Sequence, residues 1–223
     1  MEGNVRNRID VTKAIIDGGI IAVIRAPDAE QAFNLAEAAY KGGINAVEIT
    51  MTVPGGIEII RELASKYHND KVIIGAGTIL DPETARLSIL AGAEYIICPN
   101  FNENVIRTSH RYGKACIPGC MSVTEIVEAM ECGADLVKVF PADVLGPEFI
   151  KDVRGPLPHA MLVPTGGVNI DNVEKWFEAG AVALAVGGEL TREAVAKHDF
   201  GIMERKAAEF AARVKAARRG KNV

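Results

Sequence analysis

Short apolar runs alternate with helical segments along nearly the whole sequence, and a glycine recurs where one segment gives way to the next. The pattern is clearest at Lys41-Gly42-Gly43-Ile44, Ala91-Gly92-Ala93-Glu94, Cys132-Gly133-Ala134-Asp135 and Ala179-Gly180-Ala181-Val182. A glycine just past the last helical residue is typical of a helix C-terminus, and an apolar run after it indicates a strand. Because these runs are continuously apolar, they predict a parallel sheet covered by helices.

Eight such runs are expected to be strands, each followed by a helix. They span residues 20–24, 46–50, 72–75, 95–98, 115–117, 136–139, 162–163 and 182–186. Eight strand–helix units in 223 residues fit a (β/α)8 TIM barrel better than a doubly wound sheet. A short helix that ends at Gly18-Gly19 precedes the first strand. No linker interrupts the pattern, so we expect a single barrel domain over residues 1–223.

Composition limits the possible partners and the compartment. The net charge of −4 offers no basic field for nucleic acid. No apolar run approaches the roughly 20 residues that span a bilayer, and polar residues 1–10 lack the apolar core of a signal peptide. The four cysteines (Cys98, Cys116, Cys120 and Cys132) form no CxxC pair. We therefore expect a cytoplasmic protein with reduced cysteines, without nucleic-acid or membrane partners.

Two charged residues stand inside apolar strands, Glu48 in the second and Lys138 in the sixth. An unpaired ammonium is costly to bury, and burial lowers the pKa of a lysine toward the neutral amine that attacks carbonyls. A nearby glutamate supplies the general acid and base of Schiff-base chemistry. Two alternatives stay open: Lys138 could lie on the polar face of a half-exposed strand, or it could form a structural ion pair with Glu48.

The ends of the later strands carry two glycine pairs, Gly166-Gly167 and Gly187-Gly188. In barrels of this kind, the loops after the seventh and eighth strands often bind phosphate through backbone N–H groups and a helix N-terminus, here expected near Asn169 and after Gly188. Glycine pairs also serve any tight turn. None of the four histidines (His68, His110, His159 and His198) falls at a strand end, so no metal site is expected.

Four motifs resemble one family in order and spacing: Val47-Glu48-Ile49-Thr50, Gly75-Ala76-Gly77-Thr78, Val137-Lys138-Val139-Phe140-Pro141-Ala142 and Pro164-Thr165-Gly166-Gly167-Val168. The family is the class I 2-dehydro-3-deoxy-phosphogluconate and 4-hydroxy-2-oxoglutarate aldolases. The resemblance implies a (β/α)8 barrel, commonly a homotrimer, that cleaves a 2-keto-4-hydroxy acid into pyruvate and an aldehyde without a metal or another cofactor.

The resemblance also implies roles for individual residues. Lys138 would form the Schiff base at C2, and Glu48 would take the proton of the C4 hydroxyl and protonate the pyruvate enamine. The substrate-binding residues expected on this basis are Arg25, Thr52, Thr78, Pro99, Phe140, Thr165, Gly166, Gly167, Gly187 and Gly188.

Two positions depart from the family pattern. Thr52 stands where many members carry an arginine for the substrate carboxylate, and Arg25 is the candidate substitute unless it only faces solvent. Glu189 stands where relatives often place a serine, and its charge opposes a bound phosphate. Alternative functions are a 2-dehydro-3-deoxy-6-phosphogalactonate aldolase, a phosphosugar isomerase or synthase, and a barrel kept as a binding or assembly module, although the last predicts loss of Glu48 or Lys138.

Overall fold

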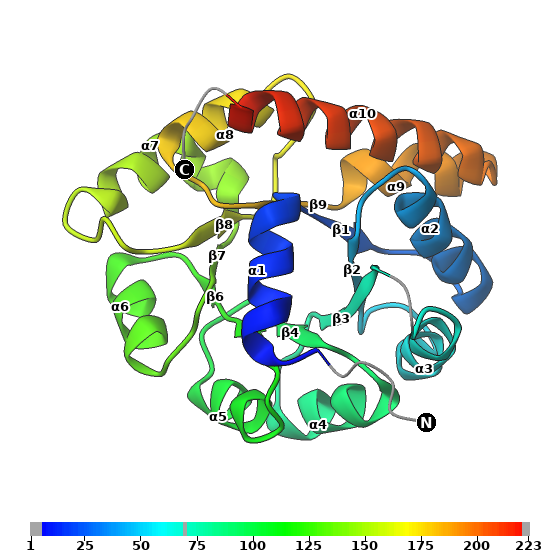
Figure 1. Ribbon diagram of the computed structural model, residues 1–223, viewed down its shortest axis with the longest axis horizontal. Coiled ribbons are helices and arrows are strands. Elements are labelled where there is room, and N and C mark those ends of the chain that lie inside the picture. The colour runs from blue at the N-terminus through cyan, green and yellow to red at the C-terminus, as the bar shows by residue number, and fades with distance from the viewer. Residues whose placement is uncertain (1–5, 69–70, 220–223) are drawn as a thin grey trace.

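Parallel strands at the centre of the protein are surrounded by helices in the computed structural model (Figure 1), which describes residues 6–68 and 71–219. The first five residues of the polar leader lie outside this description. The strands are β1 (Ile20–Ile24), β2 (Ala46–Thr50), β3 (Ile73–Gly77), β4 (Tyr95–Ile97), β5 (Ala115–Ile117), β6 (Gly119–Cys120), β7 (Val137–Val139), β8 (Leu162–Pro164) and β9 (Leu184–Val186).

Each predicted helical segment forms a helix, and several begin at a side-chain cap. Asp28, Asp81, Asn102 and Ser122 accept hydrogen bonds from backbone N–H groups of the first turns of their helices. The helices are α1 (Arg8–Gly18), α2 (Ala29–Lys41), α3 (Gly56–Lys66), α4 (Pro82–Ala91), α5 (Glu103–Arg111), α6 (Val123–Glu131), α7 (Ala142–Arg154), α8 (Val173–Ala179), α9 (Gly188–Lys197) and α10 (Phe200–Arg219).

The recurring glycines have the conformation that the sequence predicts. Gly43, Gly92, Gly133 and Gly180 all adopt positive φ, between 87° and 114°, just after a helix ends. A side chain is disfavoured in this region, and glycine is free of that penalty. Each of these glycines turns the chain back toward the entrance of the next strand, which is why the sequence repeats the pattern.

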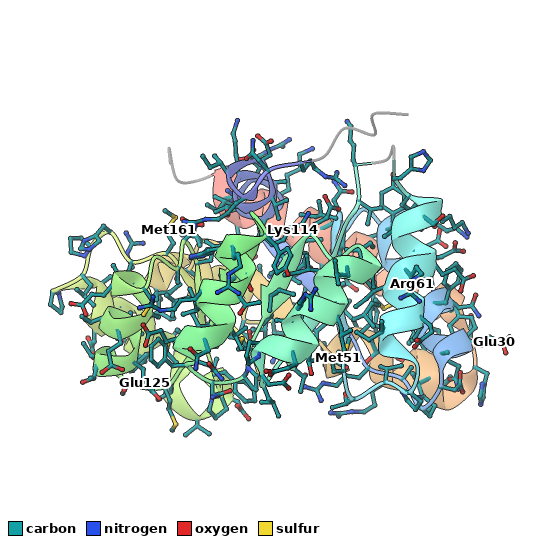
Figure 2. The ribbon with its side chains drawn as sticks, turned by 90° about the horizontal axis from the view of Figure 1, so that it is seen from below. Glu30, Met51, Arg61, Lys114, Glu125 and Met161 are labelled. Atoms are coloured by element: carbon teal, nitrogen blue, oxygen red, sulfur yellow. The ribbon has the colours of Figure 1, made fainter. Side chains whose placement is uncertain are left out.

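All strands run away from α1, which covers one end of the molecule. Figure 2 shows α1 at the same end as Lys114 and Met161, which precede β5 and β8, while Met51 and Glu125 lie toward the opposite end. Side chains on the inner side of the strands form one apolar cluster with Val11 and Ile15 of α1, and a larger cluster fills the space between strands and helices. The C-terminal ends of the strands therefore lie at the end of the molecule opposite α1.

The hydrogen-bonded strands divide into two sheets, where the sequence predicted one ring of eight strands. The six-stranded sheet has the order β5-β4-β3-β2-β1-β9, and the three-stranded sheet has the order β6-β7-β8. One division falls at Pro118, between β5 and β6, where proline has no N–H to continue a ladder, and the other lies between β8 and β9. An isolated parallel bridge between Thr165 and Ala185 links β8 to β9.

The predicted strand bounds are otherwise close. Those of β1, β2 and β5 are confirmed, whereas β9 begins at Leu184 and is shorter than predicted at its start. The helix expected near Asn169 begins at Val173. Within the described ranges, no helix has the length and apolar character needed to span a membrane.

Candidate active site

Glu48 and Lys138 point to the inner side of the strands, toward the end opposite α1. In a strand, side chains two residues apart share a face, and both Ala46 and Leu136 belong to the interior apolar cluster. Glu48 is 1% exposed and Lys138 is 5% exposed. The interpretation of Lys138 as a residue on the polar face of a half-exposed strand is therefore wrong.

The two buried charges perturb each other without touching. No ion pair joins Glu48 to Lys138 among the residues that the structure describes, and Oε2 of Glu48 has no hydrogen-bond partner there. Burial raises the pKa of Glu48, while the charges of Lys138 and Arg25 oppose that rise. Burial lowers the pKa of Lys138, Glu48 opposes that change, and Arg25 adds to it. The structural ion pair that the sequence left open is thus not formed.

The carboxylate of Glu48 occupies room that exists because residue 77 is glycine. A Cβ placed on Gly77 would overlap the Glu48 side chain, and one placed on Gly75 would overlap the ring of Tyr95. Glu48 pairs in register with Gly75, and Thr50 pairs with Gly77. The second and third strands therefore hold the acid in a notch in the wall of the interior.

Phe140 connects Lys138 to a cavity at the ends of the strands. Nζ of Lys138 lies 4.8 Å from the centroid of the Phe140 ring, a cation–π distance. The cavity has a volume of about 270 Å³ and brings together seven of the predicted substrate-binding residues. Its lining comprises Val23, Arg25, Phe140, Thr165, Gly166, Gly167, Val168, Asn169, Ala185, Gly187, Gly188, Glu189 and Arg192.

Three predicted substrate-binding residues lie at strand ends but outside this lining. Thr52 is exposed, and its Oγ1 is 2.8 Å from Oγ1 of Thr50. Thr78 is half-buried with a φ of 60°, rare for a residue other than glycine and often found where a site fixes the backbone. Pro99 is half-buried, and its carbonyl group lies against Gly119.

The two glycine pairs lead into different local structures. Gly187 caps the ten-residue helix α9, which begins at Gly188, so free backbone N–H groups of that helix face the cavity end. Gly166 and Gly167 both have positive φ and lead instead into a turn, because the seven-residue helix α8 starts only at Val173. The expectation of a helix N-terminus directly behind each pair is confirmed for the second pair and wrong for the first.

Arg192 is a cavity residue that the sequence interpretation missed. It lies in α9, one turn after Gly188, and lines the same cavity as Arg25. The signal available in the sequence was its spacing, because side chains on a helix lean toward the N-terminus and a cation four residues after a glycine pair reaches back to it.

The described residues offer no metal site, and a second cavity lies away from the strand ends. Within the described part of the chain, no group of three or more His, Cys, Asp or Glu side chains is placed to hold a metal ion. A larger cavity, of about 600 Å³, lies at the α1 end between α1, α8 and α10, and none of the predicted site residues lines it. The chemistry predicted from the sequence is therefore confined to the opposite end.

Comparison with known proteins adds to this geometry. The family model for KDPG and KHG aldolase matches residues 11–205. The chain belongs to the KDPG and KHG aldolase family. It is 35% identical over 200 residues to a 2-dehydro-3-deoxy-6-phosphogalactonate aldolase of Escherichia coli, covering 89% of this chain and 94% of the relative.

Two further similar proteins are named for the gluconate isomer of the substrate. The 2-dehydro-3-deoxy-phosphogluconate aldolase of Treponema pallidum is 33% identical over 195 residues, covering 86% of this chain and 91% of the relative. The crystal structure of the KDPG aldolase of Legionella pneumophila, with pyruvate captured as a covalent carbinolamine, matches with a TM-score of 0.81 and 28% identity, covering 88% of this chain and 96% of that one.

Proposed function

We propose that this protein is a class I aldolase that reversibly cleaves 2-dehydro-3-deoxy-6-phosphogluconate, 4-hydroxy-2-oxoglutarate, or both, to pyruvate and an aldehyde such as glyceraldehyde 3-phosphate or glyoxylate. One observation carries the proposal: a lysine 5% exposed, with a lowered pKa, shares the interior with a glutamate whose carboxylate it does not contact. A neutral amine and a nearby carboxylate are the nucleophile and the base that Schiff-base chemistry needs.

The proposed steps use these two side chains. The neutral Nζ of Lys138 adds to the C2 carbonyl, and loss of water gives a protonated imine. Glu48 removes the proton of the C4 hydroxyl, the C3–C4 bond breaks, the aldehyde leaves, and the bonding electrons form an enamine. Glu48 then returns its proton to C3, and hydrolysis releases pyruvate and frees the lysine. The raised pKa of Glu48 suits a group that both accepts and donates a proton.

Arg25 is proposed to bind the pyruvate carboxylate. It is exposed on its outer side but lines the cavity, and it lies close enough to Lys138 to lower the pKa of that amine. A guanidinium group matches a carboxylate with two parallel hydrogen bonds. Thr78 is proposed to assist at the carboxylate, and Thr52 and Pro99 to border the mouth. Thr165 and the two glycine pairs are proposed to hold the phosphate.

The galactonate isomer stays a candidate substrate because a relative of that name is 35% identical to this chain. The two isomers differ in configuration at C4, the carbon whose hydroxyl Glu48 is proposed to deprotonate. Assaying cleavage of both 6-phosphorylated acids side by side decides between them.

We further propose that the chain is a single closed (β/α)8 barrel over residues 1–223. The bridge from Thr165 to Ala185 supports closure on one side, and on the other side β5 and β6 are consecutive segments separated only by Pro118. A cytoplasmic location is proposed because all four cysteines are free thiols.

A homotrimer is proposed from a patch of exposed leucines beside and on α4. Leu80, Leu87 and Leu90 are between 56% and 62% exposed. Clusters of exposed apolar side chains mark interaction surfaces more often than isolated ones do. Sedimentation of the protein with Leu87→Lys and Leu90→Lys, against the unchanged protein, measures whether this patch joins copies of the chain.

Trapping the imine tests the proposed function. Incubation with pyruvate and borohydride is expected to add a reduced pyruvate adduct to Lys138, located by peptide mass mapping, and Lys138→Ala is expected to abolish the adduct and the cleavage activity. Addition of EDTA is expected to leave activity unchanged, in keeping with a metal-independent mechanism. A label on Lys114 or Lys151 instead would refute the role given to Lys138.

A further inference from the structure

The guanidinium group of Arg192 lies over the start of its own helix. Its Nη2 is 3.3 Å from the position that a Cβ on Gly188 would take, and its Nε and Cζ are within 3.9 Å of that position. Residue 188 carries no side chain, so the guanidinium can approach the backbone there. Arg192 thus adds a charged donor to the free N–H groups at the N-terminus of α9.

Arg192 also has no competing partner among the described residues. No hydrogen bond or ion pair involves its side chain there, although other arginines of the chain, such as Arg8 and Arg213, do form ion pairs with carboxylates. An exposed cation that lines a cavity without a partner is available to bind an anion from solvent.

Glu189 also lines the cavity, and a cation outside the lining lies near its carboxylate. Nζ of Lys206 lies 3.9 Å from Oε1 of Glu189 and donates a hydrogen bond to the Glu189 backbone oxygen at 3.1 Å. The same ammonium pairs with Glu193 at 3.2 Å. The negative charge of Glu189 is therefore shared with α10, and the repulsion of phosphate expected from the sequence is reduced.

The end of the neighbouring strand β8 presents a second unsatisfied polar group to the cavity. Thr165 is only 9% exposed, and its Oγ1 has no hydrogen-bond partner among the described residues. A buried hydroxyl without a partner is unfavourable, so such a group is usually satisfied by a ligand or by water. Thr165 lines the cavity that Arg192 also lines. Donors from two separate elements therefore line one cavity.

We propose that Arg192 makes this cavity selective for substrates that carry a phosphate monoester on the tail, by donating two hydrogen bonds to its oxygens while the Thr165 hydroxyl donates a third. This inference rests on the proposed function and adds to it the residue that sets the substrate class. Arg25 and Arg192 then bind the two anionic ends of one substrate, and the Phe140 ring leads from the cavity to the Lys138 amine.

Kinetics on a matched substrate pair test this role. The pair is 2-dehydro-3-deoxy-6-phosphogluconate and its dephosphorylated form, which differ only in the group that Arg192 is proposed to bind; if the galactonate isomer is the better substrate, the galactonate pair replaces it. Arg192→Gln is expected to lower kcat/KM for the phosphorylated acid by about 10- to 100-fold, mostly through KM, since it removes a hydrogen bond to a charged group. The dephosphorylated acid is expected to change by less than about twofold, because it makes no such contact.

Two further variants keep the test specific. Arg205→Gln removes an exposed arginine of α10 that lies outside the cavity lining, and it is expected to change neither substrate. Arg192→Lys keeps the charge without the planar fork and is expected to retain part of the selectivity. An equal loss on both substrates, or no loss on either, would overturn the role of Arg192.

The result also separates this inference from the proposed function. If the unchanged protein forms the Lys138 adduct and cleaves the phosphorylated acid while Arg192→Gln does the same at full kcat/KM, only the inference fails. If the unchanged protein forms no adduct and cleaves neither acid, the proposed function itself fails.

Discussion

The two ends of this protein treat charged side chains in opposite ways. At the α1 end, Arg6 forms an ion pair with Glu94 at 2.7 Å, and Arg8 forms one with Asp135 at 2.6 Å. These contacts fasten the start of the chain to the entrances of β4 and β7. At the opposite end, Glu48 and Lys138 are far more deeply buried and are not paired with each other.

The difference shows how each end uses electrostatic free energy. Direct pairs near the surface keep both partners charged and stabilise the fold modestly. A buried charge without a direct partner is costly, and that cost is what raises the pKa of Glu48 and lowers that of Lys138. The reaction therefore requires buried, unpaired charges at the end opposite α1, whereas the charges at the α1 end are paired and stabilise the fold.

The largest effect is expected on turnover, when proton transfer by Glu48 is removed. Glu48→Gln keeps the shape of the side chain but cannot accept a proton, so turnover should fall by roughly 10²–10⁴-fold while the pyruvate adduct still forms on Lys138. Steady-state rates and borohydride trapping on the same variant measure the two properties. Near-normal turnover would reduce Glu48 to a structural neighbour of the lysine.

A smaller effect, of opposite sign, is expected on stability when both buried charges are removed. Lys138→Met combined with Glu48→Gln should abolish activity and raise the free energy of unfolding at pH 7 by about 1–4 kcal/mol, because buried charges are replaced by neutral groups of similar volume. Denaturant unfolding measures it. As a control, Lys151→Met with Glu148→Gln removes an exposed pair and should change stability by less than about 0.5 kcal/mol.

The pH dependence of that gain follows from the two pKa shifts. Lys138 has a pKa below its ordinary 10.5, so its cost is complete below the lowered pKa and disappears as pH rises past 10.5. Glu48 has a pKa above its ordinary 4.5, so its cost is complete above the raised pKa and disappears as pH falls below 4.5. The gain should therefore shrink toward both extremes. A double variant less stable than the unchanged protein would contradict the comparison of the two ends.

The smallest effect is expected at the α1 end. Arg8→Gln removes a two-pronged ion pair with Asp135 and a hydrogen bond to the Gly133 carbonyl, and should lower the free energy of unfolding by about 1 kcal/mol. Thermal melting measures it, and kcat should not change because the residue lies at the end remote from the site. Arg107→Gln, which breaks an exposed pair within α5, is the matched control with a smaller expected loss. A fall in kcat for Arg8→Gln would show that the two ends are coupled.

Much of the fold can be predicted from the sequence because it depends on residues that are close together in the chain. Apolar runs, helix caps and the glycines at 43, 92, 133 and 180 are local signals, and each forms the predicted turn or element. The division at Pro118 is also local, since proline lacks an N–H, yet the apolar run through it hides the consequence for the sheet. The later start of α8 reflects a turn in which Asn172 hydrogen-bonds to Asn169 and Gly167, an arrangement that glycine spacing alone does not indicate.

The site can be predicted only in part, because its electrostatics depend on charged residues from segments that are far apart in the sequence. Glu48 and Lys138 are visible as charged residues within apolar strands. The sequence places Glu189 beside a phosphate but gives no hint of Lys206 from α10 beside it, because that contact joins two separate helices. Arg192 is different, because its spacing from Gly188 within one helix was a local signal that the sequence interpretation did not use.

The notch at Gly77 couples residues 48 and 77, although the two positions are encoded by separate codons. Since a side chain at residue 77 would overlap the Glu48 side chain, residue 77 cannot gain a side chain unless residue 48 moves or becomes shorter. A mutational path that enlarges residue 77 has to shorten the acid at residue 48 in the same step or pass through a dead intermediate. Directed evolution of this scaffold should therefore randomise these two codons jointly, and a library that varies them one at a time samples almost none of their workable combinations.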